Sequence, residues 1–579
     1  MDFNLNGITF NAQTTNDIKN QSLKCIKSGE ISEYLLSIDF GKKISPSTYT
    51  LTWCENANDA YALWSPNCGQ NTNIPPEWAP HVQQSKTASG MPLISVYSKS
   101  NVNKTTVYLS DTANACAISV GVVEYGAKLK FSVTLFSDIM PEISTYSVVL
   151  VIDNTKNSFS KTIKNAREWW TKNGHNCAVV PSVAKYPLYS FWYSYHQQTY
   201  ANDIILECKK AKEFGFKSVI IDDGWQTDDN NGGYAYCGDW EVAKSKIPDM
   251  KNLVDQIHAM DLKFILWFSV PFVGYKSKIY ERFKGKYLKH IDRLQTSVLD
   301  PRFKEVREYL TSVYVDAVKT YGYDGLKLDF IDKFTLSSES SKNYAQMDCI
   351  SVEEGVDKLL NEITLSLKKI NPNIIIEFRQ SYVGPMISKY GNIFRVGDCP
   401  DDAISNKIGT LNLRLTSGST AVHSDMIIWN NFDSNENVLN QLLGVMFSVP
   451  QISVRLNDIT NDHKKLLKNY LDFYTKHHNV LLNGNLQVYG VEAGYTMASS
   501  ALNDEKITVI YSNQVVKYSG LTEYIFNATG DNYVYIECDN QPIAQLYDYY
   551  GNLISTEKLS SKVNKINLLH GYMIKILPL

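Results

Sequence analysis

Three hydrophobic patterns follow one another along the chain. Residues 1–178 alternate apolar and polar positions in short runs broken by turn residues, as in EYLLSIDF and LKFSVTLF. Residues 179–478 alternate short apolar runs with longer amphipathic segments, and residues 479–579 return to short alternating runs such as KITVIYSN. Alternation with a period of two is typical of half-buried strands, whereas a period near 3.6 is typical of helices. We therefore predict an N-terminal β-sandwich, a strand–helix domain and a small C-terminal β-sandwich.

The strand–helix segment contains eight candidate strands. In chain order they are YSFWYSY, KSVIIDD, KFILWFSV, GLKLDF, NIIIEFR, NIFRVGD, STAVHSD and PQISV. Helical periods such as MKNLVDQIHAMD and VEEGVDKLLNEITLSLKKIN lie between them. Eight strands that alternate with helices predict a central (β/α)8 TIM barrel.

Polar or aromatic side chains stand at the ends of seven of these strands. Active sites of such barrels lie at the carboxyl ends of the strands, so residues at these positions meet at one rim. The candidates are Trp192, Tyr195, Asp222, Asp223, Trp267, Lys327, Asp329, Glu377, Arg379, Arg395, Asp398, His423 and Asp425. Any one of the charges could belong to a structural ion pair, but seven consecutive strands that end in this way favour an active site.

Composition and charge narrow the range of ligands. The 57 basic and 60 acidic residues give a net charge of −3 without a long like-charge run, which argues against nucleic acid and anionic membrane as partners. The N-terminus lacks the basic and apolar regions of a secretory signal, so we expect a cytoplasmic protein. The ten cysteines form no CxxC pair or Cys/His cluster, so we expect reduced thiols and neither a metal nor another cofactor.

Paired carboxylates among aromatic residues fit the cleavage of a glycoside. The retaining reaction needs one carboxylate as nucleophile and a second carboxylic acid that protonates the leaving oxygen. Asp329 is the better nucleophile, because Lys327 on the same strand face would keep it ionised. Asp398 is the candidate acid, with a pKa raised by a shielded position and a nearby carboxylate. Asp401 and Asp402 stay open as weaker competitors because they lie in a loop.

Several motifs of the barrel segment resemble one family. The runs VIIDDGWQTDD, CGDWEVAKSKIPDMKNLVDQIHAMDLKFILWFSVP, LDPRFKEVREYL and YGYDGLKLDF occur in this order. They resemble the α-galactosidases (melibiases) of glycoside hydrolase family 36, with a more distant likeness to family 27. The resemblance implies a retaining exo-hydrolase that removes terminal α-linked galactose from an oligosaccharide or glycoside. Members of the family are often oligomers, which leaves a homo-oligomer open.

The resemblance also implies roles for single residues. It implies Asp329 as nucleophile, with Lys327 beside it binding sugar hydroxyls. It implies Asp398 as the general acid, which would make Arg395 a sugar contact. The remaining substrate-binding candidates are Asp222 and Asp223 at O4 and O6 of galactose, Trp240 and Trp267 as aromatic walls, and Trp192, Arg379 and His423 on the rim.

Three departures from the family pattern concern the C2 substituent and the aglycone. The fifth strand continues as IIIEFRQSYVGP, which places Arg379 where the family has a small residue in a turn that borders C2. The third strand ends WFSVP without the usual glutamate, and Leu328 replaces a common tryptophan. Arg379 either binds an anionic or unusual substituent or forms a salt bridge with Glu377.

Other functions stay open at this level. An α-galactosyl transferase of the raffinose-synthase type would use the same barrel, with a sugar hydroxyl in place of water. An α-N-acetylgalactosaminidase, or another galacto-configured specificity, is the alternative among hydrolases. A non-catalytic carbohydrate-binding protein would keep galactose affinity without turnover, but the presence of Lys327, Asp329 and Asp398 favours an enzyme.

Overall fold

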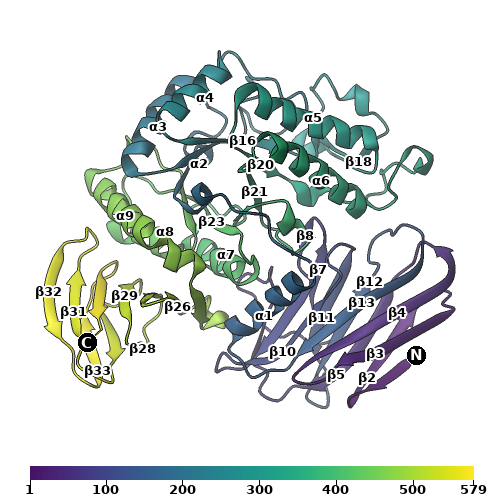
Figure 1. Ribbon diagram of the computed structural model, residues 1–579, viewed down its shortest axis with the longest axis horizontal. Helices are drawn as coiled ribbons and strands as arrows, with labels where there is room; N and C mark the ends of the chain where they lie inside the picture. The colour runs from purple at the N-terminus through teal and green to yellow at the C-terminus, as the bar shows by residue number, and fades with distance from the viewer. Residues whose placement is uncertain (579) are drawn as a thin grey trace.

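The computed structural model describes residues 1–578, which fold into three parts in chain order (Figure 1). The N-terminal strands, coloured purple to blue, form a sandwich at one end, and the C-terminal strands, coloured yellow, lie at the other. The barrel lies between and above them in this view. The predicted fold class, a TIM barrel flanked by two β-domains, is confirmed. The exact domain boundaries stay predictions.

Two antiparallel sheets form the N-terminal sandwich. Their strands are β1 (Asp2–Leu5), β2 (Ile8–Thr14), β3 (Asn20–Lys27), β4 (Ile31–Ile44), β5 (Tyr49–Asn56), β6 (Ala62–Trp64), β7 (His81–Lys86), β8 (Ser89–Gly90), β9 (Leu93–Tyr97), β10 (Asn103–Leu109), β11 (Cys116–Val122), β12 (Lys128–Leu135) and β13 (Ile143–Asp153). The sheet orders are β1-β2-β5-β12-β11-β7-β8 and β3-β4-β13-β10-β9-β6. Alternate side chains of both sheets meet in one core, in which Trp53 stacks on Phe131 with ring centroids 5.4 Å apart.

Eight parallel strands close the barrel. They are β14 (Leu188–Ser190), β15 (Ser218–Ile221), β16 (Lys263–Ser269), β20 (Gly325–Asp329), β21 (Ile375–Arg379), β22 (Ile393–Arg395), β23 (Ala421–Ile427) and β24 (Val449–Ile452). The closure is made by β14, which pairs with both β15 and β24. Each of the eight predicted strands is present. The first is shorter than predicted, because the chain enters helix α2 (Trp192–Tyr195) directly after it.

Helices connect these strands and the flanking domains. They are α1 (Phe159–Lys172), α3 (Ala201–Phe214), α4 (Met250–Ala259), α5 (Lys304–Tyr321), α6 (Val352–Ile370), α7 (Ala403–Thr416), α8 (Asn435–Gly444) and α9 (Asn461–Asn483). Several begin at a side-chain cap: Asp249 accepts a hydrogen bond from Asn252 N, and Ser351 accepts one from Glu354 N. Within residues 1–578 we find no helix that combines the length and the apolar character needed to cross a membrane.

The remaining elements are an inserted sheet, short 3-10 turns and the C-terminal domain. The inserted strands between β16 and β20 are β17 (Phe272–Gly274), β18 (Tyr287–Ile291) and β19 (Thr296–Leu299). The 3-10 turns are η1 (Ser182–Lys185), η2 (Glu281–Phe283), η3 (Asp292–Leu294), η4 (Ile331–Lys333), η5 (Tyr344–Gln346), η6 (Ile387–Lys389) and η7 (Val491–Ala493). The C-terminal strands are β25 (Asn485–Tyr489), β26 (Met497–Leu502), β27 (Glu505–Ile510), β28 (Val515–Lys517), β29 (Thr522–Asn527), β30 (Tyr533–Glu537), β31 (Ile543–Tyr547), β32 (Leu553–Lys558), β33 (Val563–Asn567) and β34 (Met573–Leu577).

The barrel interior changes from apolar to charged along the strands. Near the amino ends, one buried cluster contains Leu188, Ile220, Ile265, Ile375, Ile393 and Ala421. Side chains of a strand alternate between its faces, so residues two positions later also point inward. That second layer is Ser190, Asp222, Trp267, Lys327, Glu377, Arg395 and His423. One further step of two reaches Asp329, Arg379 and Asp425, so the charged pair Lys327 and Asp329 faces the inside of the barrel.

Candidate active site

Asp329 ends β20 and accepts hydrogen bonds on both carboxylate oxygens. Trp267 Nε1 donates to Oδ2 at 3.1 Å, and the backbone N–H of Phe330 donates to Oδ1 at 2.7 Å. The Tyr382 hydroxyl lies 3.2 Å from the same Oδ1. Phe330 has a φ of 65°, in the left-handed region, so the chain turns sharply after the carboxylate. These contacts hold the carboxylate in one orientation.

Arg379 pairs with Asp329. Its Nε lies 2.6 Å from Asp329 Oδ1. Strands β20 and β21 pair in parallel with Lys327 opposite Glu377, and the same register continued by two residues places Asp329 beside Arg379. The predicted salt bridge between Arg379 and Glu377 is therefore wrong.

The charges around Asp329 keep it ionised. Burial of the carboxyl raises its pKa, but the Arg379 guanidinium and the Lys327 ammonium act in the opposite direction and outweigh burial. The net result is a pKa well below the ordinary value of an aspartate. A carboxylate that stays charged at the end of a barrel strand is suited to act as a nucleophile.

Lys327 forms a buried ion pair with Asp222 in the second layer. Its Nζ lies 2.6 Å from Asp222 Oδ2, and the two side chains are only 5% and 4% exposed. Burial lowers the pKa of Lys327, but the carboxylates of Asp222, Glu377 and Asp329 together raise it by more, so the ammonium remains charged. The pair explains how a lysine can stand on a buried strand.

Arg395 joins three carboxylates beneath the rim. It forms ion pairs with Asp425 through Nη1, with Asp398 through Nη2 at 2.9 Å, and with Glu377 through Nε at 3.4 Å. Its side chain is 1% exposed, which leaves no surface for a sugar. The prediction that Arg395 contacts the substrate does not fit this position. Arg395 instead holds Asp398 from below.

Asp398 follows β22 and reaches the surface of the site, with a side chain that is 52% exposed. Burial of the carboxyl raises its pKa, but the Arg395 guanidinium and the Lys327 ammonium outweigh burial, and the net pKa is lowered. The predicted upward shift is therefore wrong for the free site. The cause of the lowered pKa is the direct contact of Asp398 with Arg395, a residue for which the resemblance to the family implies a sugar contact.

The two competing aspartates serve the local structure. Asp401 Oδ1 accepts a hydrogen bond from Gln441 Nε2 at 2.9 Å. Asp402 caps α7 by accepting a hydrogen bond from Ser405 N at 2.9 Å. Because Asp401 and Asp402 are occupied in this way, Asp398 is the better placed candidate for the acid.

Asp223 lies next to Asp222 and is held by two glutamines that the sequence analysis missed. Gln197 Nε2 donates to Oδ2 at 2.7 Å, and Gln226 Nε2 donates to Oδ1 at 2.6 Å. Burial raises the pKa of Asp223 to about 6. Gln226 lies in the loop after β15, and Gln197 follows α2 in the connection after β14. Their place in the connections at the carboxyl ends of the strands is the signal that could have found them.

Three tryptophans stand together beside Asp329. Trp225 stacks on Trp240 with ring centroids 6.0 Å apart, and Trp240 meets Trp267 edge-on at 6.0 Å. Trp225 Nε1 donates to the carbonyl oxygen of Trp267 at 2.9 Å and fixes that strand end. The structure thus brings the two predicted wall residues, Trp240 and Trp267, together. Trp240 is half-buried, and its contact with a sugar stays a prediction. Trp267 is only 1% exposed, so the prediction that it contacts the sugar does not fit its position.

His423 and Trp192 differ most from their predicted places. His423 is fully buried in the second layer, where its Nε2 lies 2.8 Å from the carbonyl oxygen of Ala184. Burial lowers its pKa to about 4, so the imidazole is neutral near pH 7. The prediction that His423 binds the sugar does not fit a side chain without exposed surface. Trp192 lies in α2, half-buried, with its ring edge-on to His196 at 5.1 Å.

A cavity of about 680 Å³ adjoins Asp398. The barrel contributes Gln380, Asp398 and Cys399 to its lining, and the N-terminal sandwich contributes the loop residues Pro66, Asn67, Gly69 and Gln70. The β7–β8 hairpin of the sandwich supports the same side of the site. Gly90 N donates to the carbonyl oxygen of Ser381 at 2.9 Å. The site is therefore built from two parts of the chain.

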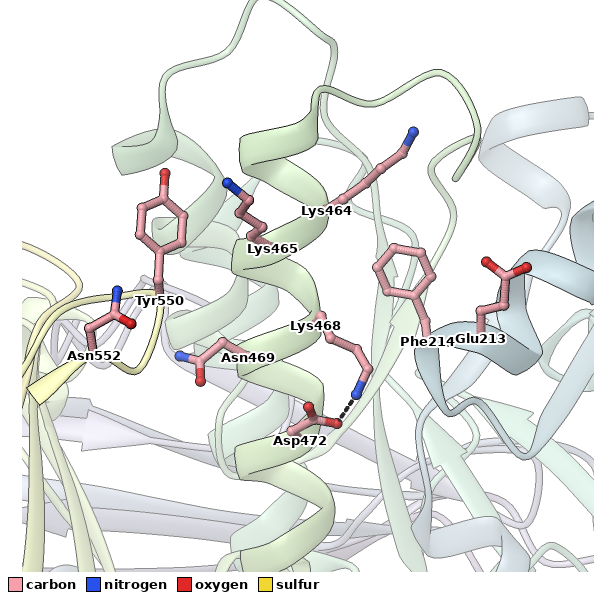
Figure 2. A pocket seen from close by; sticks show the side chains of 9 residues that line it. All are labelled: Glu213, Phe214, Lys464, Lys465, Lys468, Asn469, Asp472, Tyr550 and Asn552. Atoms are coloured by element: carbon pink, nitrogen blue, oxygen red, sulfur yellow. Dashed lines mark hydrogen bonds and ion pairs between the residues drawn. The ribbon is translucent and has the colours of Figure 1, made fainter.

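A second cavity, of about 700 Å³, lies on the outer face of α9 (Figure 2). Figure 2 shows Lys464, Lys465 and Lys468 along that helix and Tyr550 and Asn552 facing it from the C-terminal domain. Lys468 pairs with Asp472 of the same helix. This cavity contains none of the barrel-rim carboxylates, so we place the chemistry at the rim instead.

The described residues form no cluster of metal-ligating side chains. Within residues 1–578, no three or more His, Cys, Asp or Glu side chains are grouped to hold a metal ion. All ten cysteines are free thiols. The chemistry of the site is that of carboxylates, cations and aromatic rings.

The first half of the barrel matches a known family. Residues 188–381, from β14 to the loop after β21, match the family model described as Melibiase. This half of the barrel is therefore similar to the melibiases. The match includes Asp222, Asp223, Lys327 and Asp329, and the predicted resemblance to the α-galactosidases of family 36 is confirmed.

The chain is also similar to segments of longer enzymes. It is 34% identical over 131 residues to α-galactosidase Mel36A of Lactobacillus acidophilus, which covers 21% of this chain and 17% of that protein. It is 32% identical over 82 residues to α-galactosidase AgaA of Geobacillus stearothermophilus, which covers 14% of this chain and 11% of that protein. The alignments thus span less than a fifth of the length of these relatives.

Solved structures share the fold over nearly the whole chain. The family 36 α-galactosidase AgaA of Geobacillus stearothermophilus, solved with stachyose, superposes with a TM-score of 0.65 at 12% identity, over 99% of this chain and 82% of that one. The α-galactosidase of Lactobacillus brevis gives a TM-score of 0.65 at 12% identity, over 99% and 80%. At such identities the likeness concerns the fold alone.

Proposed function

We propose that the protein is a retaining exo-α-galactosidase, which removes terminal α-linked galactose from an oligosaccharide or glycoside by double displacement. The observation that carries the proposal is the environment of Asp329, which stays ionised at the end of a barrel strand and is fixed by Trp267 and Arg379. The melibiase match and the α-galactosidase names of the relatives support galactose as the sugar.

In the first step, Asp329 attacks the anomeric carbon while Asp398 donates a proton to the leaving oxygen. The bond from the anomeric carbon to that oxygen breaks, and a glycosyl ester of Asp329 forms. The half-exposed Asp398 must first be protonated, although Arg395 lowers its pKa in the free site. A bound substrate covers this carboxyl and removes water from it, which favours the neutral form.

In the second step, a water molecule takes the place of the leaving group. Asp398, now a carboxylate, accepts a proton from the water, which attacks the anomeric carbon and releases Asp329. Arg395 favours this charged form of Asp398, because its guanidinium lies 2.9 Å away. The same residue thus acts as acid and then as base, and the product keeps the α configuration.

Recognition of galactose is assigned to Asp222 and Asp223. The axial O4 and the O6 of galactose lie on one edge of the sugar, and two adjacent carboxylates can accept hydrogen bonds from both. Trp240 supplies the apolar wall, with the buried Trp267 packed edge-on against it, and Lys327 donates to a sugar hydroxyl beside Asp222. The cavity of about 680 Å³ next to Asp398 receives the leaving group.

A panel of nitrophenyl α-glycosides tests the proposal. The sugars are galactose, N-acetylgalactosamine, glucose and β-L-arabinopyranose, and we expect turnover of the galactoside above the others. Proton NMR of the first-formed product should show α-galactose before mutarotation. Turnover of none of the four, or β-galactose as first product, would overturn the proposed activity or its stereochemistry. Product formation with an excess of sugar acceptor separates hydrolysis from transfer.

A further inference from the structure

Arg379 is only partly used by the protein. Its Nε is bonded to Asp329 Oδ1 at 2.6 Å, and its Nη1 donates to the carbonyl oxygen of Gln380 at 3.0 Å. Its Nη2 has no hydrogen-bond partner within residues 1–578, and it is not among the fully covered polar atoms. The side chain as a whole is 13% exposed. One guanidinium N–H group is therefore open to a ligand beside the nucleophile.

The aromatic neighbours of Arg379 fix its position. The guanidinium carbon lies 5.1 Å from the ring centroid of Phe330 and 5.8 Å from that of Tyr382. Tyr382 is buried, and its hydroxyl lies 3.2 Å from both Asp329 Oδ1 and the carbonyl oxygen of Leu328. A planar cation that contacts two rings has little freedom to move aside when a substrate enters.

The contacts of Asp329 separate the roles of its two oxygens. Oδ1 lies within hydrogen-bond distance of Arg379 Nε, the Phe330 N–H and the Tyr382 hydroxyl. Oδ2 has one donor, Trp267 Nε1. Hydrogen bonds draw electron density away from an oxygen and lower its reactivity. Oδ2 is thus the attacking atom, and Oδ1 lies to one side of the anomeric carbon.

The charge of the transition state indicates whether Arg379 lies on the ring-oxygen side or on the C2 side of the anomeric carbon. Positive charge develops on the anomeric carbon and the ring oxygen during glycoside cleavage. A guanidinium beside the ring oxygen would repel this charge. A guanidinium beside C2 faces a hydroxyl whose hydrogen bonds strengthen in the transition state. Arg379 therefore belongs on the C2 side of the sugar.

The charge count of the site argues for a neutral substrate. The cations are Lys327, Arg379 and Arg395, and the carboxyl groups are Asp222, Asp223, Asp329, Glu377, Asp398 and Asp425. Burial raises the pKa of three of these carboxyl groups, Asp223, Glu377 and Asp425. If all three of these carboxyl groups are protonated, three carboxylates remain beside three cations, so positive charges do not outnumber negative charges. An anionic substituent would therefore find no excess positive charge.

Resting on the function proposed above, we propose that Arg379, held in place by the buried Tyr382, reads the C2 position and restricts the substrate to neutral sugars with a free hydroxyl at C2. Nη2 donates to that hydroxyl oxygen. The Arg379 side chain also fills the space that a 2-acetamido group would need. Arg379 is a specificity-determining residue that in addition orients the nucleophile.

The test compares three nitrophenyl glycosides: α-galactoside, 2-deoxy-α-galactoside and 2-acetamido-2-deoxy-α-galactoside. The variants are Arg379→Lys, Arg379→Ala and Tyr382→Phe. A hydrogen bond to a charged group corresponds to about 10- to 100-fold in kcat/KM, so we expect the ratio of galactoside to 2-deoxygalactoside to fall by at least about tenfold in Arg379→Ala. Arg379→Lys keeps the charge but not the planar fork, and we expect an intermediate ratio.

The ratio separates a role at C2 from a purely structural role. Loss of orientation of Asp329 lowers kcat/KM for both substrates equally and leaves the ratio unchanged, and an unchanged ratio in every folded variant would overturn the proposal. The proposal would also be overturned if the wild type hydrolysed the 2-acetamido-2-deoxy-α-galactoside as fast as the α-galactoside. Arg282→Ala is the matched control, since Arg282 also pairs its Nε with a carboxylate, Glu305, at 3.3 Å and stacks over Tyr309 at 5.2 Å.

Calorimetry keeps this inference distinct from the proposed activity. The wild-type protein is titrated with free galactose and with 2-deoxygalactose. Preferential binding of galactose without turnover of any glycoside would remove the hydrolase function and support the C2 role. Turnover of the galactoside with equal affinity for both sugars and an unchanged kinetic ratio would leave the hydrolase and remove the role of Arg379.

Discussion

Lys327 Nζ lies 2.6 Å from Asp222 Oδ2 in the barrel interior, although β16 separates their strands. The pair belongs to the second inward layer, between the apolar cluster at the amino ends and the rim that carries Asp329. It places a fixed positive charge beneath the nucleophile, which helps to hold the pKa of Asp329 down. The buried charges of the site are therefore connected from layer to layer.

Breaking this pair is expected to cost both stability and activity. Lys327→Met leaves the Asp222 carboxylate buried without a partner, which costs about 3–5 kcal/mol in the free energy of unfolding. The double variant with Asp222→Leu removes both charges and should recover most of that loss without recovering turnover. Urea unfolding measures the first effect and nitrophenyl galactoside hydrolysis the second. A single variant as stable as the wild type would contradict the importance of the pair.

Asp329→Asn is expected to abolish turnover while the fold persists. The amide is a poor nucleophile, and loss of a catalytic carboxylate lowers kcat by about a thousandfold or more. Steady-state kinetics on nitrophenyl α-galactoside measures the loss. Asp316→Asn on the exposed face of α5, the helix before β20, is the control for removal of one carboxylate. Activity within tenfold of the wild type would remove Asp329 from the nucleophile role.

The sequence predicts the barrel well because period and strand order are local signals. All eight strands and the inward position of Lys327 and Asp329 follow from alternation along single segments. The partner of Arg379 does not follow, because it depends on the register between β20 and β21. With Lys327 opposite Glu377, Arg379 falls beside Asp329. A different register would have given other pairs from the same two sequences.

Two further errors have local physical causes. The aromatic run after β14 favours a strand by propensity, but Ser194 N lies within hydrogen-bond distance of Ser453 Oγ, and the chain turns into α2. The sequence predicts His423 at the rim because its strand ends in polar residues. It lies one layer lower, where Gln451 Nε2 and the Ala184 carbonyl satisfy both ring nitrogens. Depth along a strand cannot be judged from residue type alone.

Asp398→Ala should separate the acid from the nucleophile. Without the proton donor, substrates with poor leaving groups, such as an unactivated disaccharide, should slow far more than a nitrophenyl glycoside, whose phenolate departs with little help. Added azide should restore part of the rate on the activated substrate and yield the α-glycosyl azide, because a small anion attacks the glycosyl-enzyme without a general base. Product analysis by NMR identifies the azide.

The matched control for that experiment is Asp402→Ala. Asp402 caps α7, so its loss should lower the free energy of unfolding by about 1 kcal/mol and leave the leaving-group dependence unchanged. Equal slowing of both substrate types in Asp398→Ala, with no response to azide, would reopen the acid role for Asp401 or Asp402.

Glu353 lies outside the catalytic rim, and its buried carboxyl should make the free energy of unfolding depend on pH. Burial raises its pKa from the ordinary 4.5 to about 7, although Lys86 of the sandwich lies 3.5 Å away. A carboxyl with a raised pKa binds its proton more tightly in the folded state. Its contribution to stability is therefore fully present below pH 4.5 and is lost as the pH rises through about 7.

Urea unfolding at pH 4.5 and pH 8 measures this loss. Between these values, we expect the difference in unfolding free energy between Glu353→Gln and the wild type to shift by about 2–3 kcal/mol in favour of the variant. Glu354→Gln, one residue along α6 and 41% exposed, is the control for the change in charge. An equal pH slope for wild type and Glu353→Gln would show that Glu353 does not titrate in this range.

The contact between the β7–β8 hairpin and the loop after β21 has a consequence for the order of events during protein synthesis. Ser89 Oγ lies 3.2 Å from Ser381 Oγ, and the two serines are 292 residues apart in the chain. The N-terminal sandwich leaves the ribosome first and has its own core, so it can fold while the barrel is still being translated. The hairpin is then already in place when the segment that carries Arg379 and Tyr382 emerges. During synthesis, the loop after β21 can therefore fold against the surface of an N-terminal sandwich that is already formed.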